Sequence, residues 1–411
     1  MSALRARPGG LAALGAAAAL SAAALAPPLL AQSEPRTTGS VTLGAEVDDN
    51  PRLEPDGEFS AGVTAAARFR RSDRAPTGGW TLTGGAAARA FAGPGADDED
   101  GITDSPAALS PRLSLGVDGR GPRRSWSLTV SGSVAPSDLE STVTGPAPDP
   151  GAPGEDPFAP PERREVRDGF RANLGLSASW RERLDARRSL GLSASLNRLD
   201  FVDAPAGTPN TSASVSTRLD RVMTPRLSAS ADLALSGFAA EDVADTRSLT
   251  AALRAGGEWR ASPRLTLSGL LGPSATRTET VVEESLTPGV SATLSADWRP
   301  TRRDAWSLSF DQGVEANDDG DAVNASRLSV RLRRELTPRL RAGLSVALGA
   351  DVPLTEDAGE DRLFASASPR LDWSLTPETS LGVGYRLRLE EDGETAASHN
   401  LFLSLTRAFG R

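Results

Sequence analysis

Few side chains in this chain have the chemistry of an active site. The single histidine, His399, lies in the segment Ala-Ala-Ser-His-Asn, and the chain contains no cysteine. Membrane-barrel enzymes of the phospholipase or protease type rely on a histidine held against serine or acidic partners, whereas an isolated histidine beside a loop is usually a solvated residue. We therefore predict that the protein is not an enzyme and that it has neither a catalytic residue nor a cofactor.

Two acidic clusters, Asp97–Asp100 and Asp318–Asp321, offer carboxylates that could hold a divalent cation weakly. Neither cluster has the ligand spacing of an EF-hand loop. The simpler interpretation is that both are solvated loops, so no metal site is predicted.

The remaining candidates are charged side chains at alternate positions of predicted β-strands. Successive side chains on a strand point to opposite faces, so these charges share a face opposite an apolar one. If the strands close into a barrel, the charges line its lumen. The predicted pore-lining residues are Arg68, Arg70, Arg89, Asp232, Arg254, Asp297, Asp311, Arg331, Arg333, Arg341, Arg370, Arg386 and Arg388.

The signs of these charges are unevenly distributed along the chain. Arginines gather on the strands near the C-terminus and on those that closure brings beside them, whereas acidic residues such as Asp232 and Asp297 lie on the facing wall. Opposed charged walls would create a transverse field across a water-filled lumen. Local ion pairing between neighbouring strands is the alternative, and the sequence leaves both open.

The strands that would position these charges are recognisable because apolar and polar residues alternate along them, most clearly in Asn324–Pro353. One face of the second strand there consists of Leu340, Ala342, Leu344, Val346, Leu348 and Ala350. The same period recurs along the chain and predicts about eighteen strands of roughly ten residues, the length that a tilted strand needs to cross a bilayer. The predicted fold is all-β: a transmembrane antiparallel up-and-down β-barrel spanning residues 39–411.

The predicted connections alternate between two kinds. One kind is short and mostly basic, such as Arg334–Arg339, and the other is acidic and often longer, such as Gly93–Ser105. Bacterial outer-membrane barrels have an even strand number, short periplasmic turns and longer external loops. A soluble protein of several β-sandwiches is the alternative, but it has no reason to sort its loops in this way.

All seven tryptophans lie beside a short turn and have the parity of the apolar face. They are Trp80, Trp126, Trp180, Trp259, Trp298, Trp306 and Trp373. In a barrel they would form one ring at the periplasmic boundary between water and lipid, where an amphipathic indole is favoured.

The first residues have the features of a secretory signal. Arg5 and Arg7 precede the Ala/Leu-rich run Leu11–Leu25, and Leu29-Leu30-Ala31 is a suitable cleavage site. We predict a signal peptide at 1–31, followed by a short periplasmic segment at 32–38.

Composition agrees with a membrane barrel rather than a protein with a large internal core. Aromatic residues are 5% of the chain, and the formal net charge is −9. An acidic protein of this kind is a poor nucleic-acid binder.

Two segments carry a family resemblance: Val41–Leu53, VTLGAEVDDNPRL, and the last alternating strand, Leu401–Phe409, with its terminal aromatic. With them the chain resembles bacterial outer-membrane β-barrels of the porin type. The resemblance implies an outer-membrane location, contact with outer-membrane lipid, and recognition of the C-terminal strand by the barrel assembly machinery. Two features depart from the family pattern: Gly410 and Arg411 follow Phe409, and Arg407 occupies a position expected to be apolar.

The predicted function is an outer-membrane channel for passive diffusion of small polar solutes or ions, and a link to surface-polysaccharide export is a further hypothesis. The alternative is a structural or surface-interaction barrel with a blocked lumen. The Pro- and Gly-rich loop Ser137–Val166 could fold into the pore or project from the surface. The sequence leaves open the identity of the solute and the choice between monomer and trimer.

Overall fold

The structure is a computed structural model that describes residues 35–50, 59–92, 108–136, 170–202, 208–241, 246–279, 284–316, 322–353, 361–392 and 394–410. The predicted signal peptide at 1–31, the loop Ser137–Val166 and the acidic clusters Asp97–Asp100 and Asp318–Asp321 lie outside these residues. Within the described ranges, no helix is long and apolar enough to cross a membrane.

The described residues form a single sheet of 18 strands. The strands are β1 (Arg36–Asp48), β2 (Ser60–Ala75), β3 (Gly78–Ala92), β4 (Ala108–Arg120), β5 (Arg124–Pro136), β6 (Phe170–Arg183), β7 (Arg188–Val202), β8 (Asn210–Thr224), β9 (Leu227–Ala240), β10 (Arg247–Ser262), β11 (Leu265–Glu279), β12 (Glu284–Trp298), β13 (Asp304–Ala316), β14 (Ala322–Thr337), β15 (Leu340–Pro353), β16 (Arg362–Ser374), β17 (Thr379–Asp392) and β18 (Glu394–Phe409).

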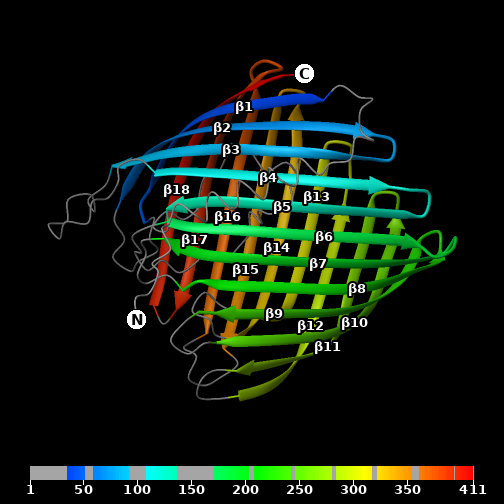
Figure 1. The fold of residues 1–411 in the computed structure, drawn as a ribbon. Helices are drawn as coiled ribbons and strands as arrows, with labels where there is room; N and C mark the ends of the chain where they lie inside the picture. Colours follow the sequence, from blue (N-terminus) through cyan, green and yellow to red (C-terminus); the bar gives the residue numbers. More distant parts are fainter. Residues whose placement is uncertain are drawn as a thin grey trace, which may run out of the picture.

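The sheet closes on itself. Each strand pairs antiparallel with its neighbours in the chain, and β1 pairs with β18 to complete the ring. In Figure 1 the strands of one wall cross those of the opposite wall steeply, as tilted strands on two sides of a barrel do. The prediction of an all-β, antiparallel up-and-down barrel of about 18 strands is therefore confirmed.

The predicted strand length of roughly ten residues is wrong, because the strands contain 13 to 16 residues. At about 3.3 Å per residue they are about 43–53 Å long, and a tilt of about 45° gives them a height of about 30–37 Å. The outer parts of each strand therefore extend past the apolar band of the bilayer into water. Ladder hydrogen bonds continue there, so polarity along the sequence does not mark where a strand ends.

The barrel wall begins before the predicted boundary at residue 39. Arg36 lies opposite Ser72 and Thr38 lies opposite Arg70 in the ladder between β1 and β2. These first residues of β1 pair with β2 alone, since the ladder with β18 starts at Gly39 opposite Phe409. Both ends of the described barrel thus meet at the rim that carries the short turns.

Several short turns share one hydrogen-bonding device. Thr224 Oγ1 accepts the backbone N–H groups of Arg226 at 3.2 Å and Leu227 at 3.0 Å. Thr337 Oγ1 accepts those of Arg339 and Leu340 at 3.2 and 3.0 Å. A hydroxyl that binds backbone groups two and three residues ahead favours a turn over a continuing strand.

The same device occurs with other side chains. Thr301 Oγ1 and Thr376 Oγ1 each accept two backbone N–H groups in the turns after β12 and β16. In the turn after β6, Asp185 Oδ1 accepts the N–H groups of Arg187 and Arg188 at 2.7 and 2.8 Å. The N–H of Arg187 and the side chain of Arg188 hold the pKa of the Asp185 carboxyl below its usual value.

A bulge precedes three of the two-residue turns. The register shifts between Val222 and Thr224, between Arg260 and Ser262, and between Glu335 and Thr337. In each case the bulge is followed by the sequence Ser/Thr-Pro-Arg-Leu. Proline cannot donate to the ladder, and the bulge raises the local twist, so the two strands separate there and reverse.

The hydroxyl of Ser262 offers a direct test, because Ser-Pro-Arg-Leu also occurs at 110–113 within β4. Ser262 Oγ accepts the N–H of Arg264 at 3.1 Å. We expect Ser262→Ala to lower the free energy of unfolding by about 0.5–1 kcal/mol, the usual contribution of one hydrogen bond. Urea unfolding of the vesicle-embedded barrel, followed by tryptophan fluorescence, measures the change. Ser110→Ala is the matched control, and equal losses in both variants would contradict the turn mechanism.

Candidate functional site

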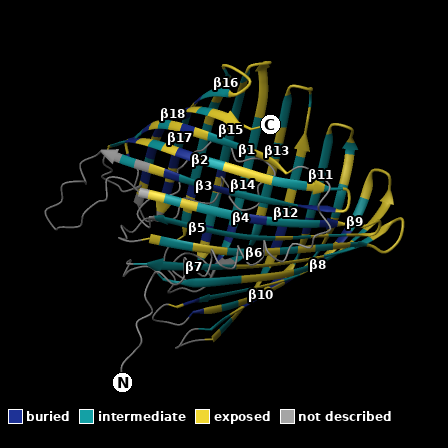
Figure 2. Cartoon of the chain, turned by 45° about the horizontal axis from the view of Figure 1, so that its top comes forward, coloured by how far each residue is buried: buried dark blue, intermediate teal, exposed yellow. Residues whose placement is uncertain are grey.

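The two faces of the barrel wall differ in chemistry and in exposure. Large apolar side chains such as Leu43, Leu253 and Leu403 are exposed on one face, at 47–60% of their surface. The other face carries smaller or polar side chains such as Thr42 and Ser404, which are buried among their neighbours. Figure 2 shows buried and exposed residues mixed along the strands of the wall. A closed barrel of this kind turns its apolar face to lipid and its polar face to the lumen, which is the surface of an outer-membrane barrel.

The tryptophans lie on the lipid-facing side, within four residues of a strand end at a short turn. Trp126 is opposite Trp180 in the pairing of β5 with β6. Trp298 is opposite Trp306 across β12 and β13, and their ring centroids are 6.1 Å apart. Trp259 on β10 is half exposed. The membrane-interface girdle, which also includes Trp80 and Trp373, stays a prediction.

At the opposite rim, which carries the longer loops, the apolar face ends in charged residues. On β7, Arg198 lies at the lipid-facing parity and is 2.7 Å from both Asp200 and Glu241. On β11, Arg277 contacts Glu279 and is 3.0 Å from Glu284. Charges on the lipid face are tolerated near the interfaces and disfavoured at the bilayer midplane. These ion pairs and the tryptophans therefore lie at opposite ends of the apolar face.

The end of the last strand explains the unexpected Arg407. It lies opposite Val41 and Thr379, two residues nearer the short-turn rim than Leu405. A guanidinium at this depth reaches the headgroup region on its flexible stem. Phe409 is exposed at the same rim, and its recognition by the assembly machinery stays a prediction.

Depth-dependent quenching tests the tryptophan girdle. We expect quenchers carried at different acyl-chain depths to find one shallow indole population, because the seven side chains share one rim. A variant with all seven tryptophans replaced by Phe and with Leu294→Trp is the control. That residue is four positions along β12 from Trp298, so its indole should lie about 9 Å deeper. Strong quenching of the native indoles from the bilayer centre would refute the girdle.

The predicted pore-lining residues all occupy the parity opposite the lipid-facing side chains. Arg68 and Arg70 are on β2, Arg89 on β3, Asp232 on β9, Arg254 on β10, Asp297 on β12, Asp311 on β13, Arg331 and Arg333 on β14, Arg341 on β15, Arg370 on β16, and Arg386 and Arg388 on β17. The side chain of Arg89 lies outside the described part of the chain. Arg333, Asp297 and Asp311 are exposed, whereas Asp232 and Arg388 are buried.

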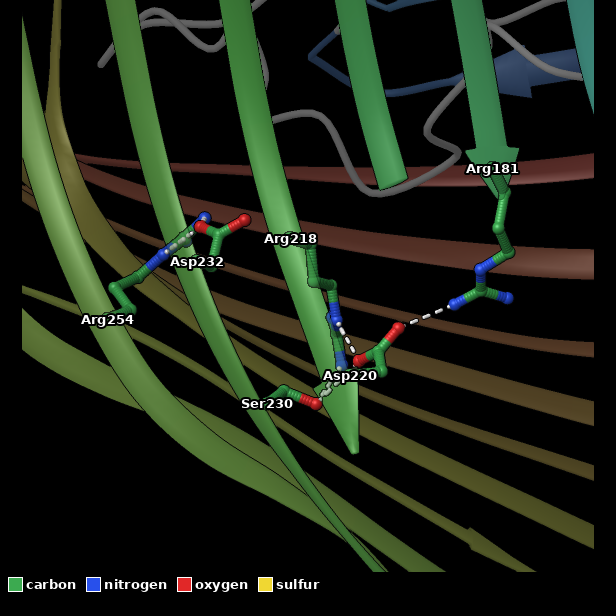
Figure 3. Close-up of polar contacts among 6 residues, drawn as sticks. All are labelled: Arg181, Arg218, Asp220, Ser230, Asp232 and Arg254. Carbon is green, nitrogen blue, oxygen red and sulfur yellow. Dashed lines mark hydrogen bonds and ion pairs between the residues drawn. The ribbon is translucent and has the colours of Figure 1, made fainter. Parts of the chain in front are cut away.

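On the wall formed by β6 to β12, opposite charges contact one another (Figure 3). Arg254 Nε donates to Asp232 Oδ1 at 2.9 Å, and Arg254 Nη1 is 3.4 Å from Thr293 Oγ1. The two charged side chains are 19% and 5% exposed. Burial weakens the screening of such a pair by water and salt, so Arg254 and Asp232 act as a local dipole more than as two free charges.

A second group on this wall is centred on Asp220. Its carboxylate accepts hydrogen bonds from Arg181 at 2.7 Å, Arg218 at 2.8 Å and Ser230 at 2.7 Å. Arg181 reaches it from β6 across the intervening strand β7. Figure 3 shows the three donors converging on this carboxylate. One carboxylate between two guanidinium groups leaves a net positive charge here, on the wall predicted to be acidic.

The wall near the C-terminus also carries its own counter-charges. Arg370 Nε donates to Asp372 at 2.8 Å, and Arg341 is 3.9 Å from Glu335. Arg388 donates to Asp48 at 3.3 Å across the closing strands. Arg68, Arg70, Asp311, Arg331 and Arg386 are likewise engaged with neighbouring groups. These contacts favour local ion pairing over a transverse field between two charged walls.

Sequence reasoning missed several inner-face partners on the same wall. Arg327 on β14 contacts Asp351 on β15, and Arg362 on β16 is 2.6 Å from Glu390 on β17. Parity alone puts these residues inside. The signal that would have paired them is the strand register, which the sequence pattern does not supply to within two residues.

Two of the inner arginines lie against aromatic rings. The Arg327 guanidinium is 4.8 Å from the centroid of Phe364, and that of Arg370 is 5.8 Å from the centroid of Phe402. A ring face attracts a guanidinium at this distance. Ion pair and ring together hold each arginine against the wall.

His399 lies on the lipid-facing side near the rim of the long loops, beside the only tyrosine in the chain. Its Nδ1 is 2.6 Å from the Tyr385 hydroxyl oxygen, and the rings are tilted with centroids 6.1 Å apart. The backbone N–H of His399 donates to Asp49 at 2.7 Å. These contacts give His399 an interfacial aromatic partner, and the prediction that it is not catalytic stays a prediction.

No family model and no curated protein matches the chain. Solved structures do show similarity. OpdK of Pseudomonas aeruginosa, solved with vanillate, has 12% identity and a TM-score of 0.47, with 91% of this chain and 99% of that chain covered. A BenF-like porin from Pseudomonas fluorescens Pf-5 has 10% identity, a TM-score of 0.48, and coverage of 92% and 99%. OccAB4 of Acinetobacter baumannii has 12% identity, a TM-score of 0.47, and coverage of 93% and 100%.

Proposed function

We propose that the protein is an outer-membrane channel through which small polar solutes or ions diffuse passively. The observation that carries the proposal is the closed ring of 18 strands with a polar inner face. Barrels of about 8 strands fill their interior with wall side chains, whereas barrels of 16 to 18 strands leave an aqueous passage. A link to surface-polysaccharide export stays a hypothesis.

The inner-face contacts support an open passage. Arg254 bonds Asp232 and Thr293 on strands next to or two places from its own, and Arg181 reaches Asp220 two strands away. These side chains are tied along the wall and not across the lumen. A solute would therefore meet fixed dipoles and hydroxyl groups, which favour water and small polar molecules over apolar ones.

Conductance in planar bilayers tests the channel directly. We expect the refolded full-length protein to produce discrete current steps whose size rises with the conductivity of the bulk solution, because the lumen contains water. A preparation that is fully folded by its gel mobility but gives no steps would support the alternative, a structural barrel with a blocked lumen.

Ion selectivity tests whether local pairing sets the field in the lumen. Asp232→Asn leaves the Arg254 charge uncompensated and should shift permeability toward anions, and Arg254→Gln should shift it toward cations. A single charge about 10 Å from the ion path contributes roughly 0.4 kcal/mol in water, so each shift should be about twofold at most. The shifts should fade as salt rises, since the Debye length falls from about 30 Å at 0.01 M to about 10 Å at 0.1 M.

The double variant Asp232→Asn with Arg254→Gln is the matched control. It removes one negative and one positive charge, so the net charge is that of the native channel. The zero-current potential should therefore return to the native value. If both single variants leave selectivity unchanged at low salt, the pair does not face the permeation path. A strong anion preference of the native channel would instead favour an uncompensated basic wall.

A further inference from the structure

The seam between β1 and β18 differs from every other pairing in the ring, because no turn joins these two strands. Their ladder has ten residue pairs, from Gly39 opposite Phe409 to Asp48 opposite Asn400. The two strands are separated by nearly the whole chain. Closure therefore requires them to find one register through non-covalent contacts alone.

The repetitive pattern of the two strands selects that register weakly. Leu43 lies opposite Leu405 on the lipid-facing side, and a slip by two residues would place it opposite Leu403. Side-chain direction repeats every two residues, so this slip keeps apolar groups facing lipid. On the inner face the Thr42 and Thr406 hydroxyl oxygens are 3.0 Å apart, and the same slip would bring the Ser404 hydroxyl beside Thr42.

The long-loop end of the seam carries a much more specific arrangement around Asp48. Asp48 Oδ1 accepts hydrogen bonds from Ser398 Oγ at 2.8 Å and from the backbone N–H of Asn50 at 3.0 Å. Asp48 Oδ2 accepts from Asn400 Nδ2 at 3.1 Å and from Arg388 Nη2 at 3.3 Å. Asp48, Arg388, Ser398 and Asn400 are each at most 4% exposed. This carboxylate is bonded to both β17 and β18.

The next two residues extend the pairing beyond β1. Asp49 N–H donates to the His399 carbonyl at 3.3 Å, and Asp49 Oδ1 accepts the His399 N–H at 2.7 Å. Asn50 Nδ2 donates to the carbonyl of Ala397 at 2.9 Å. The tripeptide Asp48-Asp49-Asn50 thus bonds four successive residues near the start of β18, which are Ala397, Ser398, His399 and Asn400.

We propose that Asp48, Asp49 and Asn50, together with Arg388, Ser398 and Asn400, form a closure latch that fixes the register in which the barrel closes. A slip by two residues would separate Asp48 from Asn400, and Asp49 from the His399 backbone. The buried carboxylate would then lose the Asn400 donor, and a buried charge that loses a partner is disfavoured. The latch therefore makes the native register the favoured one.

The latch also gives Arg388 a role distinct from lining the pore. Its side chain is 5% exposed, and its Nη2 donates to both Asp48 and Ser398. Its charge is directed at the carboxylate of the seam. Arg333, on the same inner face, is exposed and is the better candidate to face a solute.

Engineered cysteine pairs can measure the register, because the native chain contains no cysteine. Ala45→Cys with Leu403→Cys reports the native register, in which these residues are opposite each other. Ala45→Cys with Leu401→Cys reports the register slipped by two. The full-length proteins are refolded in lipid vesicles and oxidised, and the disulfide yields of the two pairs are compared.

When Asp48 is unchanged, we expect a higher disulfide yield from Ala45→Cys with Leu403→Cys than from Ala45→Cys with Leu401→Cys. Asp48→Ala should raise the slipped yield relative to the native yield by about tenfold, because a hydrogen bond to a charged group typically contributes a factor of that size or more. The control is Asp351→Asn, which removes a buried carboxylate paired with Arg327 between turn-joined strands. The control should leave the ratio unchanged, and an equal rise there would overturn the proposal.

A second variant covers the case in which Asp48→Ala does not fold. Asp48→Asn keeps the side-chain shape and one acceptor oxygen. It should raise the ratio of slipped to native disulfide yield less than Asp48→Ala does. If neither variant gives the gel shift of a folded barrel, oxidation of the Ala45–Leu403 pair should restore that shift by supplying the missing closure. Failure of the disulfide to restore folding, or an unchanged ratio in folded Asp48 variants, would refute the latch.

Discussion

Hydrogen bonding between the backbones of neighbouring strands constrains this molecule more than any side-chain contact does. Inside a bilayer there is no water to satisfy a free N–H or C=O group, so a sheet that crosses it cannot have an open edge. β1 and β18 meet that requirement by pairing with each other. The pattern of lipid-facing and inner side chains follows from the closed ring, because each strand then has one face on each side of the wall.

The same requirement explains why the seam carries specific polar contacts. Seventeen of the ring's pairings join strands that are neighbours in the chain, and β1 with β18 is the remaining one. In several short turns a hydrogen-bonded Ser, Thr or Asp favours reversal of the chain at that point. At the seam, side chains must supply the information that a turn supplies elsewhere, and Asp48 is placed to do so.

The inner wall combines small residues with anchored charges, and this decides what a solute would meet. Gly349 and Gly384 lie beside Phe364 and Phe402, where an added Cβ would be 1.7 and 2.1 Å from the aromatic rings. Each ring occupies the space of a missing side chain and supports the guanidinium beside it. Because the carboxylates Asp351 and Asp372 accompany those arginines, the wall presents oriented dipoles more than free charge.

The sequence by itself determined that there are about eighteen strands, which face of each strand is apolar, and that short turns alternate with connections that are often longer. A period of two is a local property: it needs only the order of side chains along one strand, and lipid and water impose it on all strands alike. The tryptophans were recognisable for the same reason, since parity and distance from a turn are both read along the chain.

Only the tertiary structure decided which residues meet across strands. Ser-Pro-Arg-Leu is a turn at 262–265 but lies within strands at 110–113 and 368–371. The register of β9 with β10 places Asp232 opposite Arg254, and closure of the ring brings Asp48 to Arg388 from the other end of the chain. Side-chain direction is unchanged by a shift of two residues, so the sequence pattern accepts several registers. The structure selects one because closure must satisfy every backbone group and every buried charge at once.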